Sequence, residues 1–460
     1  MQERFKLFFY KILEKPEVIF LVLSFIFGSI FLFKTPPFEV PDEAHHMLRT
    51  CEVADSIFYS KTPVQNTKYD RFFTDIDKSE NISENPNPNK YLLKREKNQF
   101  HAASRNFPIM YIGSSIGIKI GSLFTQDGNI LFYLGRFLNL LVYILLATFA
   151  IKITPVFKYP FMYLALLPMA LFEGMSYSAD SFNNGFSFLF FAFIFKLIFE
   201  KTEINKRDFS ILFLMSCIGA VCKGLIYPLG LLPFLPKFSK EFKYKKSVYI
   251  SLLVIITVFV CYSWVSINSK NLNPDYFVIN DIMYIFKEPI IVIKKFCITT
   301  YLESLNYARQ MIGVLGWLHI YLRPEIYILG FISFLSLFVV LKEKISISFR
   351  IVAFLIFFMF YSLLQYSLLI YWSNPSSPII SGFQGRYLLS VMPLFFIVLS
   401  NNRFNFSKKF INIYKFLLIL SIIYILISAC FELNTFYNVY HLDRYLMDNY
   451  IKYGTFFINK

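Results

Sequence analysis

A short polar segment after the first long apolar run holds the residues best suited to acid–base chemistry. Residues 35–50 read TPPFEVPDEAHHMLRT. Proline suits the first turn of a helix, and the helix dipole favours acidic residues there, so we expect a helix to begin near Pro41. On that helix Asp42, either His45 or His46, and Arg49 would share one face, whereas Glu43 would point about 100° away. A carboxylate so placed could take a proton from a hydroxyl while its neighbours set its pKa.

The same segment allows two other interpretations. An acidic pair can simply stabilise the start of a surface helix. Alternatively, the Asp-Glu pair and the two histidines (His45 and His46) could bind a divalent cation, because carboxylate and imidazole both suit Zn or Mn. Only two or three such neighbours can point at one ion, so His319 or Asp180 would have to complete the shell. Nothing in the sequence requires the ion: an obligatory metal is not expected, and a divalent cation stays an open alternative.

Other charged residues stand at or inside apolar runs, where a charge is costly unless it is paired. Arg136 lies inside one such run (YLGRFLNLL) and could reach the membrane interface, bind a lipid phosphate or pair with a carboxylate. Lys223 stands between two apolar half-spans and suits either an anionic ligand or a hairpin tip. Arg386 and Tyr387 follow glycines in GFQGRYLL, where the planar guanidinium suits a phosphate or anchors the chain at the interface. Asp180 in MSYSADSFNN is either a helix cap or a part of the site.

The composition indicates what must hold these residues. The 460 residues are 56% hydrophobic and only 17% charged, which is low for a soluble protein and typical of a polytopic membrane protein. The net charge of +16 is therefore interpreted from its distribution among loops, and nucleic acid is not expected as a partner. Six scattered cysteines without paired spacing predict neither a disulfide framework nor a cysteine zinc site.

An all-α chain with about 11 transmembrane helices is expected, because each span needs about 20 apolar residues. The candidate spans are residues 17–34 (an uncleaved first span), 129–151, 158–177, 182–199, 209–222, 224–236, 247–267, 324–341, 350–371, 387–400 and 410–431. Residues 107–125 and 282–304 are mixed in character and suit the membrane interface. We expect one transmembrane domain over residues 1–460.

Lysine and arginine predict the orientation of these spans. The basic connections are the N-terminus and residues 152–158, 201–207, 237–246, 342–350 and 401–409. They alternate with less basic connections, so all of them can be placed in the cytoplasm without an exception. Residues 35–107 and 268–323 then form two large extracytoplasmic loops. The chain is expected in the cytoplasmic (inner) membrane as a multi-pass protein, with its chemistry on the outer face.

Six motifs resemble, in their order, a bacterial membrane family named domain of unknown function 2142, over about residues 35 to 395. They are PPFEVPDEAHHMLR, LGRFLNLL, MSYSADSFNN, KGLIYPLGLLPFLP, GVLGWL and GFQGRYLLSVMP. That family looks like a branch of the GT-C superfamily, whose members transfer sugars from polyprenyl-phosphate carriers outside the membrane. Protein mannosyltransferases of that superfamily carry Asp-Glu followed shortly by His in the first outer loop, which PDEAHH resembles. The chain departs from the family at Ala44, where proline is frequent, and residues 55–105 match no motif.

The resemblance implies a GT-C-like bundle and an inverting glycosyltransferase. Asp42 and Glu43 would form the catalytic pair, with Asp42 as the base and Glu43 helping to shape the site. The residues expected to bind substrate are His46, Arg49, Arg136, Asp180, Lys223, His319, Arg386 and Tyr387. The charge of the leaving phosphate would be held by Arg386, with Lys223 or Arg136.

The expected donor is a sugar linked to polyprenyl phosphate, and the expected acceptor is an envelope glycan, a glycolipid or a protein. Two alternatives remain on the sequence. A transporter or flippase for lipid-linked saccharide would also need membrane-embedded charges, although these should gather near the midplane. A polysaccharide polymerase would use a whole glycan chain as its donor.

Overall fold

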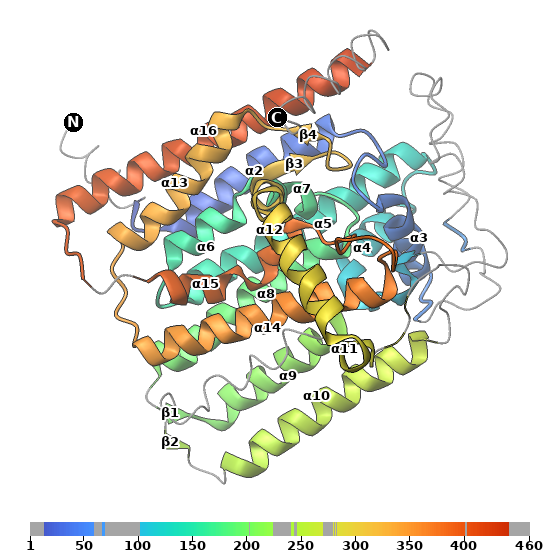
Figure 1. The fold of residues 1–460 in the computed structure, drawn as a ribbon. Coiled ribbons are helices and arrows are strands. Elements are labelled where there is room, and N and C mark those ends of the chain that lie inside the picture. The colour runs from blue at the N-terminus through green and yellow to red at the C-terminus, as the bar shows by residue number, and fades with distance from the viewer. Residues whose placement is uncertain are drawn as a thin grey trace, which may run out of the picture.

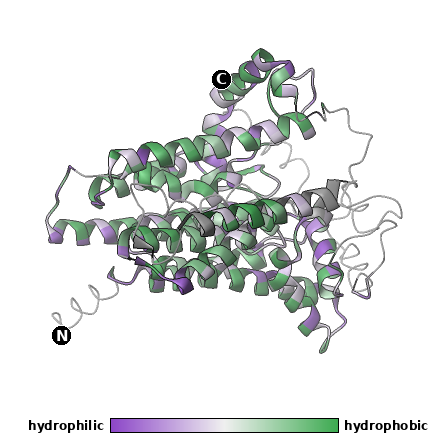
Figure 2. Cartoon of the chain, turned by 90° about the horizontal axis from the view of Figure 1, so that it is seen from below, coloured by the Kyte–Doolittle hydropathy of each residue, from purple (hydrophilic) through white to green (hydrophobic). Residues whose placement is uncertain are grey.

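The computed structural model describes residues 13–58, 67–69, 102–201, 203–223, 241–242, 246–269, 279, 281, 283–400 and 403–440. These residues are mostly helical, and their long helices lie side by side in one bundle (Figure 1). Figure 2 shows hydrophobic residues along most of the bundle. The described residues therefore agree with an all-α architecture.

Five of the described helices are long and apolar enough to cross a membrane. They are α2 (Pro16–Lys34), α5 (Gly128–Ile153), α8 (Ala179–Phe195) with its π-helical continuation η6 (Lys196–Glu200), α14 (Ile347–Tyr371) and α16 (Lys408–Tyr440). Four further predicted spans coincide with α9 (Lys206–Lys223), α10 (Lys246–Ser269), α13 (Pro324–Val340) and the segment formed by η8 (Gly385–Val391) and α15 (Met392–Leu399). The predicted span 224–236 lies outside the described residues.

The predicted span 158–177 is a broken helix at the centre of the bundle. It consists of α6 (Lys158–Ala165) and α7 (Pro168–Gly174), and nearly every residue in it is buried. Pro168 cannot donate a backbone hydrogen bond, so the helix ends before it and a new one starts with the proline in its first turn. The Tyr143 hydroxyl donates to the freed Ala165 carbonyl at 2.8 Å. A segment that is hydrophobic all round is thereby held inside the protein.

The basic connections come together at one end of the bundle. The Tyr159 hydroxyl donates to the Leu13 carbonyl, and the Phe157 amide donates to the Glu343 carboxylate at 3.2 Å. Lys342 donates to the side chain of Asn405. The two-residue strands β1 (Glu203–Ile204) and β2 (Glu241–Phe242) pair in parallel, at the lower left of Figure 1. Contacts between segments far apart in the chain thus bring the basic connections together at one end, as the distribution of lysine and arginine predicts.

The opposite end carries several shorter elements, of which α3 (Glu43–Ala54) and α4 (Ile112–Gly121) lie on the right of Figure 1. The long helix α12 (Pro289–Gly313) leads into two of them. The other short elements are η4 (Ala102–Arg105), η5 (Pro108–Tyr111), α11 (Tyr284–Lys287), β3 (Val314–Leu315) and β4 (Ile320–Tyr321). The last two form an antiparallel hairpin after α12. Lys34 and Arg323 bond to Asn434 and Glu432, at 2.7 and 3.0 Å, and so fasten α16 to this end.

Candidate active site

Asp42 stands immediately before α3 with an exposed side chain. Its backbone is left-handed, with φ of 60°, a conformation that aspartate adopts more readily than most residues. Its carboxylate does not cap the helix, although aspartate is a preferred N-cap residue. The helix therefore begins at Glu43 rather than near Pro41, and the Asp42 carboxylate does not cap it.

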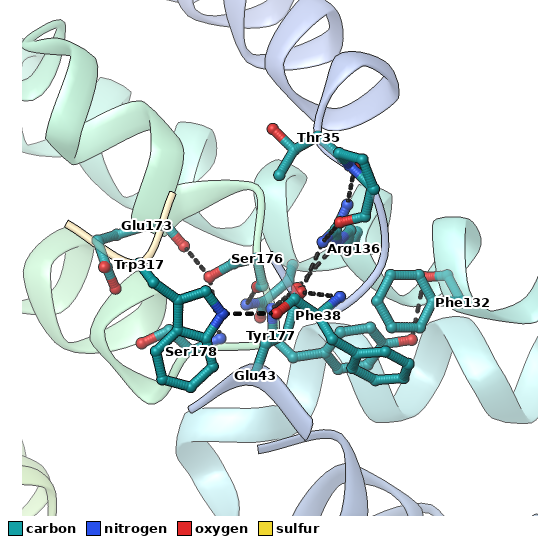
Figure 3. Close-up of polar contacts among 12 residues, drawn as sticks. Thr35, Phe38, Glu43, Phe132, Arg136, Glu173, Ser176, Tyr177, Ser178 and Trp317 are labelled. Atoms are coloured by element: carbon teal, nitrogen blue, oxygen red, sulfur yellow. Dashed lines mark hydrogen bonds and ion pairs between the residues drawn. The ribbon is translucent and has the colours of Figure 1, made fainter. Parts of the chain in front are cut away.

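Glu43, the next residue, is fully buried in an ion pair with Arg136 of α5. Arg136 Nε and Nη2 donate to the two carboxylate oxygens at 2.8 and 2.5 Å, which is the bidentate geometry that guanidinium favours. The remaining guanidinium bonds go to the carbonyls of Thr35 and Pro36, at 2.6 and 3.0 Å. The Tyr177 amide donates to the same carboxylate at 3.2 Å (Figure 3). Of the three options for Arg136, pairing with a carboxylate is therefore the one observed.

Phe38 is held in a second left-handed backbone conformation, with φ of 67°, which is unusual for a bulky residue. Its amide donates to Glu43 at 3.0 Å, and its carbonyl accepts from Trp317 Nε1 at 2.9 Å. Figure 3 shows Trp317 reaching this loop from the β3–β4 hairpin. Such strain, about 1–3 kcal/mol, persists only where the surroundings enforce it. The Glu43 carboxylate thus fixes the loop that presents Asp42.

Glu39, next to Phe38 in the same loop, was not among the residues singled out in the sequence. Burial and the negative charge of Glu43 raise the pKa of Glu39 to about 7. The positive charge of Arg136 acts in the opposite direction and is the smaller effect. A carboxyl that titrates near neutral pH can exchange a proton under working conditions. Its charge also acts on the buried Tyr437 at the end of α16.

His46 belongs to a hydrogen-bonded chain of four residues. The Asn106 amide donates to the Tyr111 hydroxyl at 2.8 Å, and that hydroxyl lies 2.7 Å from His46 Nδ1. Burial raises the pKa of Tyr111, so its hydroxyl keeps the proton that it can donate to His46. Arg49 donates to the Asn106 carbonyl at 3.2 Å and forms a buried ion pair with Glu52 at 2.8 Å. Arg49 thus helps to fix the position of His46 through Asn106 and Tyr111.

A third buried ion pair joins Arg386 of η8 to Glu173 of α7. Arg386 Nε and Glu173 Oε2 are buried without a hydrogen-bond partner among the described residues. The charge of Asp180 acts on both members of the pair and on Tyr387. The charge of Asp42 also acts on Tyr387. The fold therefore gathers the loop between α2 and α3, the start of α8 and the start of η8 in one place.

Asp180 does not cap its own helix. Ser178 is the N-cap residue, and its hydroxyl accepts from the Asp180 amide at 3.1 Å. Since the capping explanation applies to Ser178, the carboxylate of Asp180 remains a candidate for the site. Its charge also acts on Tyr111, so it stands between the His46 chain and Tyr387.

His319, one of the predicted substrate-binding residues, contacts α16 rather than this cluster. His319, on the β3–β4 hairpin, packs its ring 4.9 Å from that of Phe436, and burial lowers its pKa below the usual range. Lys223 is the last residue of α9, and its side chain lies outside the described residues. Over the described ranges, no three or more His, Cys, Asp or Glu side chains are grouped as metal ligands.

Sequence reasoning missed Glu39, Glu173 and Trp317. Glu173 was detectable, because a lone acidic residue inside a predicted span demands a partner. Trp317 stands in the GVLGWL motif, although its contact with Phe38 could not be read from it. Glu39 gave no local signal, since its pKa depends on burial by segments distant in the chain.

A scan against protein families matches the family described as "predicted membrane protein (DUF2142)" over residues 25–395. No curated protein and no solved structure matches the chain. The match includes most of α2 and all the residues of the cluster built by Asp42, Arg136, Asp180 and Arg386. The chain belongs to the DUF2142 family of predicted membrane proteins.

Proposed function

We propose that this protein is a GT-C-type glycosyltransferase of the cytoplasmic membrane that moves a sugar from a polyprenyl-phosphate carrier to an acceptor hydroxyl. The observation that carries the proposal is the contrast between Asp42 and Glu43. One carboxylate is exposed at the mouth of the cluster, and its neighbour is buried and holds the loop in place. Catalytic side chains are expected to be positioned by such a rigid supporting shell.

In the proposed reaction Asp42 accepts the proton of the acceptor hydroxyl. The acceptor oxygen attacks the anomeric carbon from the face opposite the phosphate, so a new C–O bond forms as the bond to the phosphate oxygen breaks. The phosphate leaves with the bonding electron pair, and the configuration at the anomeric carbon is inverted. A phosphate leaves as a stable anion, so no general acid is needed at that oxygen.

The charge balance of the cluster calls for a further cation. Asp42, Asp180 and Glu173 bring three carboxylates against the single guanidinium of Arg386. The unpartnered Arg386 Nε gives one charge-assisted hydrogen bond to a phosphate. Lys223 and a divalent ion are the two candidates for the additional positive charge. Loss of transfer in chelator with rescue by one divalent ion would identify the ion, and loss in Lys223→Gln would identify the lysine.

The depth of the charges favours an enzyme over a transporter. Arg136 is eight residues from the start of α5, about 12 Å along the helix, and it pairs with Glu43 at the start of α3. Glu173 and Arg386 lie where α7 ends and η8 begins. A transporter for lipid-linked saccharide should instead place its ionisable groups at the midplane, between repeated halves. The charge placement supports an active site at one face.

The test uses the purified full-length chain in proteoliposomes with polyprenyl-phosphate-linked sugars as donors. Transfer of labelled sugar to a lipid or glycan acceptor is expected, and it should depend on Asp42. A flippase would move the labelled lipid between leaflets without breaking the sugar–phosphate bond. A polymerase would use only donors that carry an assembled glycan chain. Either result in place of single-sugar transfer would replace the proposal.

A further inference from the structure

Helix α8 carries a polar stripe into the interior of the bundle. Asn183 and Ser187 are fully buried, and Asn184 is 2% exposed. With about 100° between successive residues, these three side chains and Asp180 fall within an arc of about 100° on the helix surface. Over the seven residues from Asp180 to Ser187 the stripe descends about 10 Å along the helix.

The stripe begins at Asp180, whose charge acts on residues of the candidate active site. Gly185, on another face of α8, packs against Leu146 of α5. Phe182 and Phe186, on a third face, stack with their ring centroids 5.7 Å apart. Helix α8 also packs against η8, and the charge of Asp180 acts on Arg386 there. Asp180 is therefore within electrostatic reach of η8, and the three polar side chains of the stripe continue inward from it along the same side of α8.

Four polar atoms of Asn183, Asn184 and Ser187 have no hydrogen-bond partner in the part of the chain that the structure describes. They are Asn183 Oδ1 and Nδ2, Asn184 Nδ2 and Ser187 Oγ, and all four are buried. A buried polar group without a hydrogen bond has an energetic cost, because it has lost its hydrogen bonds to water. In a membrane helix, apolar residues at these positions would avoid that cost. Four unpartnered atoms in a row below Asp180 thus point to a ligand rather than to packing.

We propose that the stripe of Asn183, Asn184 and Ser187 binds the hydroxyl-rich head group of a lipid-linked substrate, as an inward extension of the active site. The chemistry selects a sugar, because amide and hydroxyl groups both donate and accept, as sugar hydroxyls do. A second phosphate or a carboxylate would call for positive charge, and the stripe has none. The identity of the ligand rests on the proposed glycosyl transfer, whereas the existence of a site does not.

The site is tested by thiol accessibility, which needs no catalytic turnover. Ser187→Cys is made in a background whose six native cysteines are replaced, and the protein is reconstituted in proteoliposomes. A small cationic methanethiosulfonate should label it at least about tenfold faster than Ala192→Cys, which is equally buried but off the stripe. Equal rates at the two positions would overturn the proposal.

Protection identifies the ligand. A saturating polyprenyl-phosphate-linked sugar should slow labelling of Ser187→Cys about tenfold, and polyprenyl phosphate alone or free sugar should not. Protection by the phosphate alone would mean that the lipid anchor, not the sugar, covers the stripe. Fast labelling with no protection by any probe would mean that the stripe lines a hydrated cleft and does not bind the donor. Both results would overturn sugar binding. These labelling results do not depend on sugar transfer. The proposed function is tested separately, by the transfer activity of Asp42→Asn.

Stability gives a second measurement. If the stripe exists for a ligand, Asn183→Leu should raise the Tm of the ligand-free protein by about 2 °C or more. Added to Ser187→Cys, the same change should abolish protection of the introduced thiol by the donor. A structural role for Asn183 predicts a lower Tm instead, with donor protection retained. Asn183→Ser keeps a polar side chain and should retain part of the protection.

Discussion

At the scale of single residues, Asp42 and Glu43 are neighbours in the chain with opposite surroundings. Asp42 is exposed and its charge acts on Tyr387, whereas Glu43 is buried and receives hydrogen bonds from Arg136, Phe38 and Tyr177. A carboxylate with both oxygens occupied is poorly placed to accept a proton from a substrate. The geometry therefore favours Asp42 as the base and gives Glu43 a positioning role.

Replacing Asp42 by asparagine should lower the rate of sugar transfer about 10²–10⁴-fold, because that is the typical contribution of a general base. Donor binding should survive, since asparagine keeps the shape and the hydrogen-bonding capacity of the side chain. Transfer kinetics and donor-protection assays separate the two effects. Glu325→Gln, an exposed carboxylate in the first turn of α13, is the matched control and should behave as wild type. Near-normal transfer by Asp42→Asn would exclude it as the base.

Glu39 should make the stability of the protein depend on pH in an identifiable direction. Its pKa is raised from 4.5 to about 7 in the folded state, so the folded protein holds this proton more tightly than the unfolded chain does. Between these two pH values the unfolded state releases the proton first, and stability is lost as pH rises through the folded pKa. The Tm of wild type should therefore fall relative to Glu39→Gln from about pH 5 to about pH 8. Parallel Tm curves for the two proteins would contradict the shifted pKa.

At the scale of elements, the Glu43–Arg136 pair joins α3, α5 and the loop between α2 and α3. The same two side chains also satisfy the carbonyls of Thr35 and Pro36 and the amide of Phe38. The Arg136 guanidinium therefore does not reach the membrane interface. The loop between α2 and α3 cannot move without leaving a buried charge unpaired. Such a connection keeps Asp42 in place while substrates bind and leave.

Removing either partner alone should destabilise the protein by about 3–5 kcal/mol, because an unpaired charge remains buried. Glu43→Leu and Arg136→Leu together should cost less than the sum of the two single changes, by about 0.5–3 kcal/mol. The double variant should not recover fully, since the loop carbonyls lose their donors. Thermal or denaturant unfolding of the four proteins in detergent gives the coupling energy. Strict additivity would mean that the pair carries no interaction energy.

Gly385 determines how closely η8 approaches α12. A Cβ at this position would overlap the Tyr307 carbonyl oxygen, which is backbone and cannot rotate away. Gly385→Ala should therefore shift η8 with Arg386, at a cost of about 1–3 kcal/mol, and reduce transfer. Gly330→Ala is the control, since its Cβ would meet only the mobile end of the Ile312 side chain at 3.0 Å. Equal stability of the two variants would show that η8 adjusts freely.

At the scale of the whole molecule, the connections sort into two opposite ends. One end joins the basic connections through Leu13, Phe157 and Glu343, and the other carries the candidate active site. Positive residues are retained on the cytoplasmic side, so the site should face outward. A lipid-linked donor in the outer leaflet would present its sugar at that level.

Single exposed cysteines test this orientation in intact cells. Asn374→Cys, between α14 and η8, should react with a membrane-impermeant thiol reagent added outside. Glu200→Cys, at the end of η6, should react only after the membrane is opened. Both variants need the cysteine-free background. The reverse pattern would turn the site toward the cytoplasm and would exclude an extracytoplasmic reaction.

The sequence by itself determined the helical elements and their separation into two ends. Long apolar runs predict α2, α5, α14 and α16 because a helix satisfies its own backbone hydrogen bonds wherever water is absent. The density of charge after the first run predicts the loop around Asp42. These are local properties, and each depends on residues close together in the chain.

The tertiary structure alone decided which charges meet. Arg136 pairs with a carboxylate 93 residues away, and Arg386 with one 213 residues away. Every buried charge needs a partner, but composition and periodicity do not say which partner, because the choice depends on how the helices pack. The same packing placed Asp42 outside and Glu43 inside, broke the span 158–177 at Pro168, and buried the polar stripe of α8.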